Sequence, residues 1–553
     1  MNAFAAAFKK AGVIQEPPPS VQSVDNILKR IPMMYRAQVS GRCSLQFAGN
    51  NQDLDDWTEE WTYKNKQGEA CYQHKTRPIG LDKAVYRVQV EFPFRLFSNC
   101  GQDSIARPVI GKNGIPLLPG SSVKGLFKRA CNDRQKLKYC GNADQPGELR
   151  FLGAYPVGNW AKRIVDVVHP QQARQLGSSE RQTSANAIIS FYRPLMMFEF
   201  SCAKPDVDWN EVRRILTAAL QRGVGGKTSN GYGMGGNLAG QPTITPAFPV
   251  SLLLSGVGVS SQLRNNVPEF RPNLFKASLR GHVSRLLAGV CAEEHRVTSG
   301  VNALFGDQKA ESAVRLIWQS RSEEFDTHGQ NPTYKTEGIL YLDAPEDDRL
   351  FIKQVLKFAF VMGGFGKSWR RVWHGEFLPD YHSRKFAIGC HWTSKEMDDI
   401  LTVEQLKTFL NQLHKSCCDR LNVRVPQSLK WRESWHPERV AVYAKLTQQS
   451  EVIRLFHDES FKTTPAIGGK NPGDTRPRFV SSVWHRMLPV ENQFLEIVTV
   501  FHGDRTPWSH QQEGCQLLKF VQELEGKDFN LAWGNAPKNV PRVVKVADPK
   551  RKR

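Results

Sequence analysis

Two short segments occur twice in this chain, in the same order and at similar spacing. In the first half, residues 118–129 precede the Gly-rich stretch 223–233; in the second half, residues 275–285 precede the Gly-rich stretch 363–371. Each copy joins a basic segment with the pattern of a helix start to a basic loop rich in glycine. Helix starts and Gly-rich loops both hold phosphate groups. The repeat therefore predicts two copies of one domain, each able to bind a phosphate chain.

Hydrophobic patterning gives each copy the same predicted order of elements. In the first copy, residues 84–97 alternate as a strand does, and Ser121 or Ser122 is a suitable N-cap for the helix that follows. The predicted elements after that helix are strands at 187–192 and 195–201 and a helix at 209–222.

The second copy repeats this order of elements. Residues 250–254 are predicted to form a strand, and Ser278 is the predicted start of a helix. Strands at 313–318 and 338–343 and a helix at 351–362 follow. Strand, helix, two strands and a helix fit a βαββαβ unit. We therefore expect an α+β protein with tandem ferredoxin-like, RRM-like domains.

Domain boundaries follow from the repeat and from breaks in composition. Residues 376–545 contain a predicted helix at 403–421 and a predicted strand at 494–500, and a third ferredoxin-like unit there is left open. The expected divisions are an N-terminal extension (1–83), a first domain (84–241), a second domain (250–375), a C-terminal region (376–545) and a basic tail (546–553).

The formal net charge of +21 over 553 residues limits the partners that this chain can have. Charge of this size says little about fold and favours a polyanion as partner. A basic RNA-binding protein of ribosome assembly is the plain alternative to a more specialised role.

The cysteines and the hydropathy exclude two further classes. The 11 cysteines include no CxxC pair, so a zinc site of that type is not expected, and their scatter suits a reducing cytoplasm. No apolar run reaches the roughly 20 residues that span a bilayer. We expect a soluble cytoplasmic protein without a metal or a cofactor.

The two motifs supply the predicted RNA-binding residues. A helix start leaves backbone N–H groups unpaired beside Lys124, and glycines let the backbone at Lys227 approach a phosphate. By alignment of the motifs, Arg280 and Lys367 are the counterparts of these two lysines. The full predicted set is Ser121, Ser122, Lys124, Lys128, Gly225, Gly226, Lys227, Thr228, Ser229, Tyr232, Arg271, Lys276, Arg280, Lys367, Ser368, Trp369, Arg370 and Arg371.

These motifs resemble those of the RAMP superfamily (repeat-associated mysterious proteins) of CRISPR effectors. The first half is similar to subunit six of the Cmr (type III-B) complex, and the second half is more weakly similar to subunit one. The stretches that carry the first likeness are 115–125, 165–170 and 225–233, and those that carry the second are 270–281, 304–306, 363–367 and 476–482.

The resemblance implies ferredoxin-like cores and a non-catalytic, RNA-binding subunit of a type III CRISPR effector complex. The implied partners are guide RNA, target RNA and other effector subunits, including backbone RAMP subunits, with no membrane.

The resemblance also indicates where a nuclease would carry its acid. RAMP subunits that cut target RNA have an aspartate in the loop before the first helix, and Ala106 stands at that place here. Asp103 lies three positions earlier, and Glu269 is the only acid in the second loop, residues 257–274. We expect no enzyme activity. The alternative is an endoribonuclease, cutting target RNA or processing guide RNA, with Asp103 or Glu269 as a displaced acid.

Overall fold

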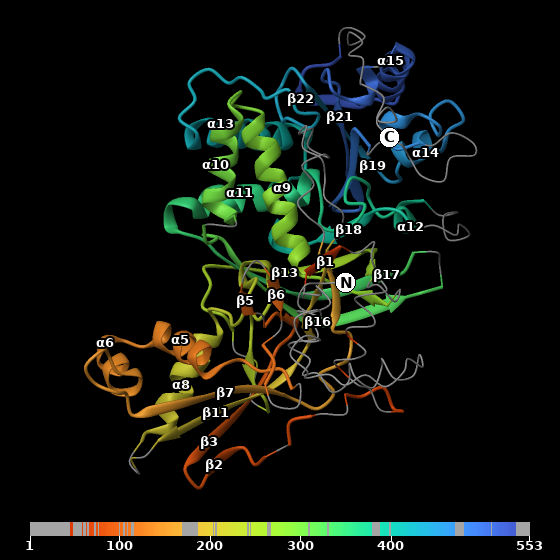
Figure 1. The fold of residues 1–553 in the computed structure, drawn as a ribbon. Coiled ribbons are helices and arrows are strands. Elements are labelled where there is room, and N and C mark those ends of the chain that lie inside the picture. Colours follow the sequence, from red (N-terminus) through yellow and green to blue (C-terminus); the bar gives the residue numbers. More distant parts are fainter. Residues whose placement is uncertain are drawn as a thin grey trace, which may run out of the picture.

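The computed structural model describes residues 45–47 and, with gaps, residues 58–537, the larger gaps being 169–185, 379–386 and 470–480. Most of the predicted lead-in and all of the basic tail thus lie outside the described residues. Helices and antiparallel strands alternate along the chain, which confirms the predicted α+β class. Three main sheets, each with its own helices, form the body of the protein (Figure 1).

The first sheet has the order β12-β3-β11-β7, and β2 pairs with the start of β3 on the side where β12 pairs with its end. Helices α5 and α8 pack on one face, where Phe127 and Leu216 meet Val90 and Phe198 in one apolar core. The bounds are β2 (Gly80–Asp82), β3 (Val85–Glu91), α5 (Gly120–Ala130), β7 (Leu149–Val157), β11 (Leu195–Cys202), α8 (Trp209–Leu220) and β12 (Asn237–Leu238).

Helix α5 begins earlier than its serines predicted. Pro119 is the N-cap, and neither Ser121 nor Ser122 caps the helix with its side chain, so that prediction is wrong. Leu118 still pairs with Ala154 of β7 through backbone hydrogen bonds of 2.8 and 2.9 Å. The chain then turns at Gly120, where a Cβ atom would lie 1.9 Å from a backbone oxygen of β7. Contact with β7, rather than a side-chain cap, therefore fixes the helix start.

The second sheet has the order β16-β17-β13-β18, with helices α9, α10 and α11. Helix α9 starts at Asn273 after Pro272, so Ser278 lies within the helix and the predicted start there is wrong. Proline at the helix boundary brings a φ angle already suited to the helix. The bounds are β13 (Val250–Val259), α9 (Asn273–Ala288), α10 (Glu294–Phe305), β16 (Arg315–Asp326), β17 (Thr333–Asp343), α11 (Glu346–Met362) and β18 (Cys390–Thr393).

The third sheet has the order β20-β21-β19-β22. Helix α13 (Val403–Arg420) connects the second sheet to the third, close to its predicted range of 403–421. One apolar cluster runs through the second and third sheets, so these two parts share a core. The bounds are β19 (Val440–Thr447), α14 (Val452–His457), β20 (Val483–Val490), β21 (Gln493–Phe501), α15 (Gln511–Glu525) and β22 (Asn530–Gly534).

Short strands fill the connections between the main elements. A two-stranded hairpin, β5 with β6, lies within residues 98–117, and the strand predicted at 84–97 is divided into β3 and β4. The short strands are β1 (Leu45–Phe47), β4 (Arg95–Leu96), β5 (Cys100–Gln102), β6 (Ile105–Arg107), β8 (Val165–Val168), β9 (Asn186–Ile189), β10 (Phe191–Tyr192), β14 (Ser261–Gln262) and β15 (Pro268–Glu269). No helix among the described residues is long and apolar enough to cross a membrane.

Candidate nucleic-acid interface

The two Gly-rich loops attach to their domains in the same way. Gly226 forms an antiparallel bridge with Phe97, and Lys367 forms one with Val259. Each loop directly follows a long helix of its copy, α8 or α11, and bridges to the end of β4 or β13. The repeat seen in the sequence is therefore a repeat of backbone structure at these loops.

Backbone angles give the correspondence between the loops residue by residue. The glycine before each bridge has a positive φ, +79° at Gly225 and +95° at Gly366. The residue after each bridge is left-handed although it carries a side chain, with φ of 57° at Lys227 and 61° at Ser368. Ser368, not Lys367, is thus the structural counterpart of Lys227, which corrects the alignment of the motifs by one position.

The first copy presents its basic helix to solvent. Ser121, Ser122, Lys124 and Lys128 are exposed on α5, whose apolar face turns inward. Neither lysine has an ion-pair partner among the described residues. In the loop, Gly225 is exposed, whereas Gly226 and Lys227 to Ser229 are partly exposed. This surface offers positive charge, hydroxyl groups and accessible backbone, which suits a phosphate chain.

The second copy uses much of its predicted basic set inside the protein. Lys367 and Ser368 are exposed, but Arg370 is buried and bonds both carboxylate oxygens of Glu433 at 2.8 and 2.9 Å. Arg285 of α9 donates to the same carboxylate at 2.6 Å. Burial alone would raise the pKa of Glu433, yet the charges of these two arginines and of Arg432 lower it to about 2. Arg370 is therefore held in an internal ion cluster.

Trp369 and Arg371 complete this internal packing. The guanidinium of Arg370 lies 4.4 Å from the centre of the half-buried Trp369 ring. Arg371 is buried, donates to the Ile467 carbonyl at 2.6 Å and to Ser481 Oγ at 2.7 Å, and so ties the second sheet to the third unit. Burial lowers the pKa of Arg371 to about 9. The side chain of Arg371 is unavailable to a phosphate in this arrangement, as is that of Arg370.

Arg280 differs in the same way from Lys124, its sequence counterpart. Its guanidinium donates to Asn302 Oδ1 and to the Gly306 carbonyl, each at 2.6 Å. Both acceptors lie at the end of α10, so Arg280 braces one helix against the next. The structure therefore places this predicted phosphate ligand in a packing role.

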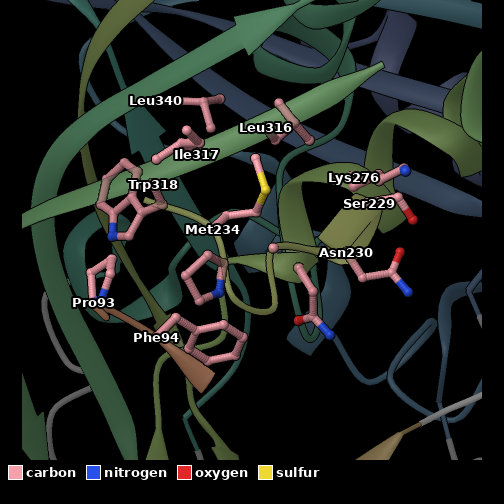
Figure 2. Close-up of a pocket in the computed structure, with 13 residues that line it drawn as sticks. Pro93, Phe94, Ser229, Asn230, Met234, Lys276, Leu316, Ile317, Trp318 and Leu340 are labelled. Atoms are coloured by element: carbon pink, nitrogen blue, oxygen red, sulfur yellow. The ribbon is translucent and has the colours of Figure 1, made fainter. Parts of the chain in front are cut away.

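Lys276 lies in a narrow seam between the first loop and helix α9. The seam is lined by Ser229 and Asn230 of the loop and by Trp318 of β16, and its enclosed volume is ≈ 10 Å³ (Figure 2). Lys276 Nζ donates to Ser312 Oγ at 2.7 Å. Burial and the nearby charge of Arg280 lower the pKa of Lys276 to about 7. The ammonium group is thus held close to the loop at a site that is nearly closed.

Tyr232 and Arg271, both predicted to bind RNA, are buried in a polar cluster between the first two domains. Tyr232 donates its hydroxyl to Asp166 Oδ2 at 2.5 Å and accepts from Arg271 at 2.8 Å. Arg271 also pairs with Asp166 Oδ1 at 2.5 Å, and Ser190 Oγ donates to the same aspartate at 3.2 Å. We call these four residues the Asp166 cluster. None of their side chains is free to meet a phosphate here.

Glu269 is the other acid at this boundary. It is buried and accepts two hydrogen bonds from Arg95, at 2.8 and 2.7 Å. This carboxylate is therefore held in a buried ion pair with an arginine of the first domain. Asp103 lies outside the described residues. The described residues contain no group of three or more acidic, His or Cys side chains that could hold a metal ion.

Comparison with known protein families gives one match, and it lies in the first copy. Residues 103–234 match the family model described as the RAMP superfamily. We call this stretch the RAMP segment, after the family model that it matches. The RAMP segment contains α5 with Lys124, the Asp166 strand and the Gly-rich loop as far as Met234. The resemblance expected from the sequence is therefore confirmed for this segment.

Comparison with solved structures gives more distant likenesses. Cmr1 from Pyrococcus furiosus is 12% identical with a TM-score of 0.31, covering 46% of this chain and 88% of that one. Cmr6 from the same organism is 16% identical with a TM-score of 0.18, covering 27% and 95%.

A third likeness is to a chain of the type III-B Cmr-beta complex bound to cognate target RNA, at 18% identity and a TM-score of 0.25. The match covers 30% of this chain and 61% of that chain's own length. TM-scores at this level carry no argument about function. A search of curated proteins gives no match.

The partners of the buried basic residues were missed by reasoning from sequence. Arg95, Glu433 and Asp166 organise the structure around both loops, and none was singled out as a site residue. The one available signal was the RAMP-like stretch 165–170, which contains Asp166. Arg95 pairs with Glu269, 174 positions away, and Glu433 pairs with Arg370, 63 positions away. No local sequence pattern reveals pairs at such separations.

Proposed function

We propose that this protein is a non-catalytic RNA-binding subunit of a type III CRISPR effector complex in the cytoplasm. It would hold guide RNA and its target duplex beside other effector subunits, including backbone RAMP subunits. The observation that carries the proposal is the exposed pair Lys124 and Lys128, without described acidic partners, on a helix of the RAMP segment. The net charge of +21 supports a polyanionic partner.

We also propose that the chain contains three ferredoxin-like units. In each of the three main sheets the fourth strand pairs with the first, the first with the third and the third with the second. This order, with helices after the first and third strands, is the one expected of a βαββαβ unit. The proposed divisions are the first domain at 84–241, the second from 250 to β18 (Cys390–Thr393), and a third within 376–545.

The proposed RNA surface is smaller than the sequence predicted. It keeps the residues whose side chains or backbone face solvent and leaves out those held inside the protein. Lys276, which lines the seam, is among those left out. The surface consists of Ser121, Ser122, Lys124, Lys128, Gly225, Gly226, Lys227, Thr228, Ser229, Lys367, Ser368 and the exposed part of Trp369.

The absence of catalysis is part of the proposal. Ala106 has no group that could position a metal or a 2′-hydroxyl, and Glu269 is occupied by Arg95. An endoribonuclease that uses Asp103 is the second candidate. Asp103→Ala in the assembled complex separates the two, because loss of a single target-RNA cleavage position with RNA binding intact would establish the nuclease.

Replacement of Lys124 and Lys128 by alanine tests the RNA surface. Because phosphate contacts release counterions, the double variant should bind single-stranded RNA more weakly, and the slope of log K against log salt should become shallower by about 1.4. Base preference should not change, since phosphate contacts position RNA without reading its sequence.

Lys407→Ala with Lys415→Ala is the matched control, because these lysines are exposed on α13, away from the two loops. This control should keep the affinity and the salt slope of the parent. Equal binding by the α5 double variant and the parent, with one salt slope, would rule out the proposed surface.

A further inference from the structure

The Asp166 cluster joins three segments that are far apart in the sequence. Tyr232 belongs to the end of the first Gly-rich loop, Asp166 to β8, and Arg271 lies two residues before α9 of the second domain. Tyr232 is 1% exposed, Asp166 0% and Arg271 6%. The cluster therefore lies wholly inside the contact between the two domains.

On the first-domain side, Tyr232 fixes the return of the loop. Its ring packs edge-on against Phe94 with the centroids 5.5 Å apart. The next residue, Gly233, donates its N–H to the Arg95 carbonyl at 2.7 Å and accepts from Val224 at 3.0 Å. A Cβ at Gly233 would lie 1.9 Å from the Val224 carbonyl oxygen, so the loop backbone approaches Val224 closely at this point. The position of Tyr232 thus sets the position of the loop.

On the second-domain side, Arg271 fixes the start of α9. Its carbonyl accepts the Leu274 N–H at 3.0 Å in the first turn of the helix. Lys276 follows in the next turn and lines the seam beside Ser229. A movement of Arg271 would therefore move the helix start relative to the first loop.

Ion pairs in and beside the Asp166 cluster connect the first domain to the second. Arg95 lies beside the cluster, donates to Ser190 Oγ at 3.0 Å and pairs with Glu269 of the second domain. Burial alone would raise the pKa of Asp166, but the charges of Arg271 and Arg95 lower it below its ordinary value. A buried pair of this kind is costly to break, because the remaining charge is left without a partner.

We propose that Asp166, Tyr232 and Arg271 are positioning residues that lock the first Gly-rich loop to the start of helix α9, so that the two domains present their RNA surfaces in one fixed register to a single strand. The inference rests on the proposed RNA-binding function and adds to it a mechanical link between the two copies. The Tyr232 hydroxyl is the smallest part of the link that a substitution can remove.

The test compares two RNA lengths on the full chain. A strand of about 5 nucleotides occupies one surface, and a strand of about 20 nucleotides reaches both. Because a fixed register makes the second contact intramolecular, the parent should bind the long strand much more tightly than the short one. Tyr232→Phe should reduce the ratio of long-strand to short-strand affinity about tenfold. Arg271→Lys, which keeps the charge and loses the fork geometry, should act in the same direction.

Tyr443→Phe is the matched control. Tyr443 is 1% exposed in the third sheet, and its hydroxyl has no hydrogen-bond partner among the described residues. This variant should leave the affinity ratio unchanged. If Tyr232→Phe weakens both strand lengths equally, Tyr232 acts on the loop alone and the link is disproved, while the proposed RNA function stands.

Amide hydrogen exchange tests the same link without RNA. In Tyr232→Phe, the amides of Gly226 and Gly233 in the loop and of the first turn of α9 should all exchange faster than in the parent. Faster exchange in the loop alone would overturn the link. A parent chain that binds neither RNA length would reject the proposed function, and the exchange result would still decide whether the two segments are coupled.

Discussion

The two Gly-rich loops share one backbone and use their basic residues in opposite ways. In the first copy the cations around the loop face solvent, as Lys124 and Lys128 do on α5. In the second copy Arg280 braces α10, and Arg370 enters an internal cluster with Glu433. The two loops thus share one backbone geometry and differ in whether the nearby charges face solvent or the protein interior. A basic motif is therefore evidence of binding only where its charge remains accessible.

The largest expected effect comes from removing the acid that holds the second loop. Glu433→Gln leaves Arg285 and Arg370 buried without their carboxylate, so the free energy of unfolding should fall by about 3–5 kcal/mol. Denaturant unfolding of the full chain measures this change. Glu459→Gln is the control, because Glu459 forms an exposed pair with Lys462 and should have no measurable effect. Equal stability of the Glu433 variant and the parent would mean that the second-copy arginines are not structural.

Acid should weaken the same cluster without any substitution. The folded pKa of Glu433 is about 2, below its ordinary value of 4.5, so its stabilising contribution is complete above pH 4.5 and is lost as the pH falls towards 2. The shift corresponds to about 3 kcal/mol of pH-dependent stability. Denaturant unfolding measured from pH 6 to pH 2 should show this loss in the parent and a flatter profile in Glu433→Gln. Parallel profiles would contradict the assignment.

Alanine at the paired glycines compares the two loop backbones directly. Gly225 has φ +79° and a Cβ there would lie 2.6 Å from the Phe97 carbonyl, whereas the nearest atom to a Cβ at Gly366 is 3.6 Å away. Gly366→Ala should therefore cost only the left-handed strain, about 1–2 kcal/mol. Gly225→Ala should cost more, because the clash adds to this strain. Thermal unfolding of both variants measures the order, and the reverse order would contradict the closer backbone contact at Gly225.

The smallest expected effect comes from glycine at Lys227 and Ser368, the residues of the two loops that carry a side chain at positive φ, and it distinguishes RNA binding from backbone strain. Glycine at Lys227 or at Ser368 relieves a positive φ, so each substitution should stabilise the protein by up to about 1 kcal/mol. Lys227→Gly should also weaken RNA binding and make its salt slope shallower, because a charge is lost. Ser368→Gly should leave RNA binding unchanged. Titration with RNA at several salt concentrations distinguishes the two, and equal behaviour would remove the proposed difference between the copies.

Sequence patterns predicted the elements better than their connections. Hydrophobic periodicity placed α8, α11 and α13 within a few residues, because the buried faces of these helices repeat along the chain. Serine capping failed at both α5 and α9. There the helix starts are fixed by contact of Gly120 with a strand and by a preceding proline at position 272, and the first of these is a tertiary effect.

The sequence predicted only those candidate site residues whose environment is set locally. The exposed lysines of α5 and the first loop follow from local sequence alone. The burial of Tyr232, Arg271 and Arg370 depends on partners in other domains, which a motif cannot reveal.

The buried pair of Arg95 and Glu269 has a consequence for the order in which the chain can mature. The two residues are separated by 174 positions, whereas the strands of the first sheet are complete once β12 has been made. Domains generally fold as units during synthesis, with the N-terminal one first. A nascent first domain would therefore hold Arg95 without its carboxylate partner Glu269 until translation has delivered the beginning of the second domain. Truncation between the two domains should then yield an aggregation-prone fragment rather than an independent subunit, so the chain behaves in biogenesis as one gene product that cannot be divided at this junction.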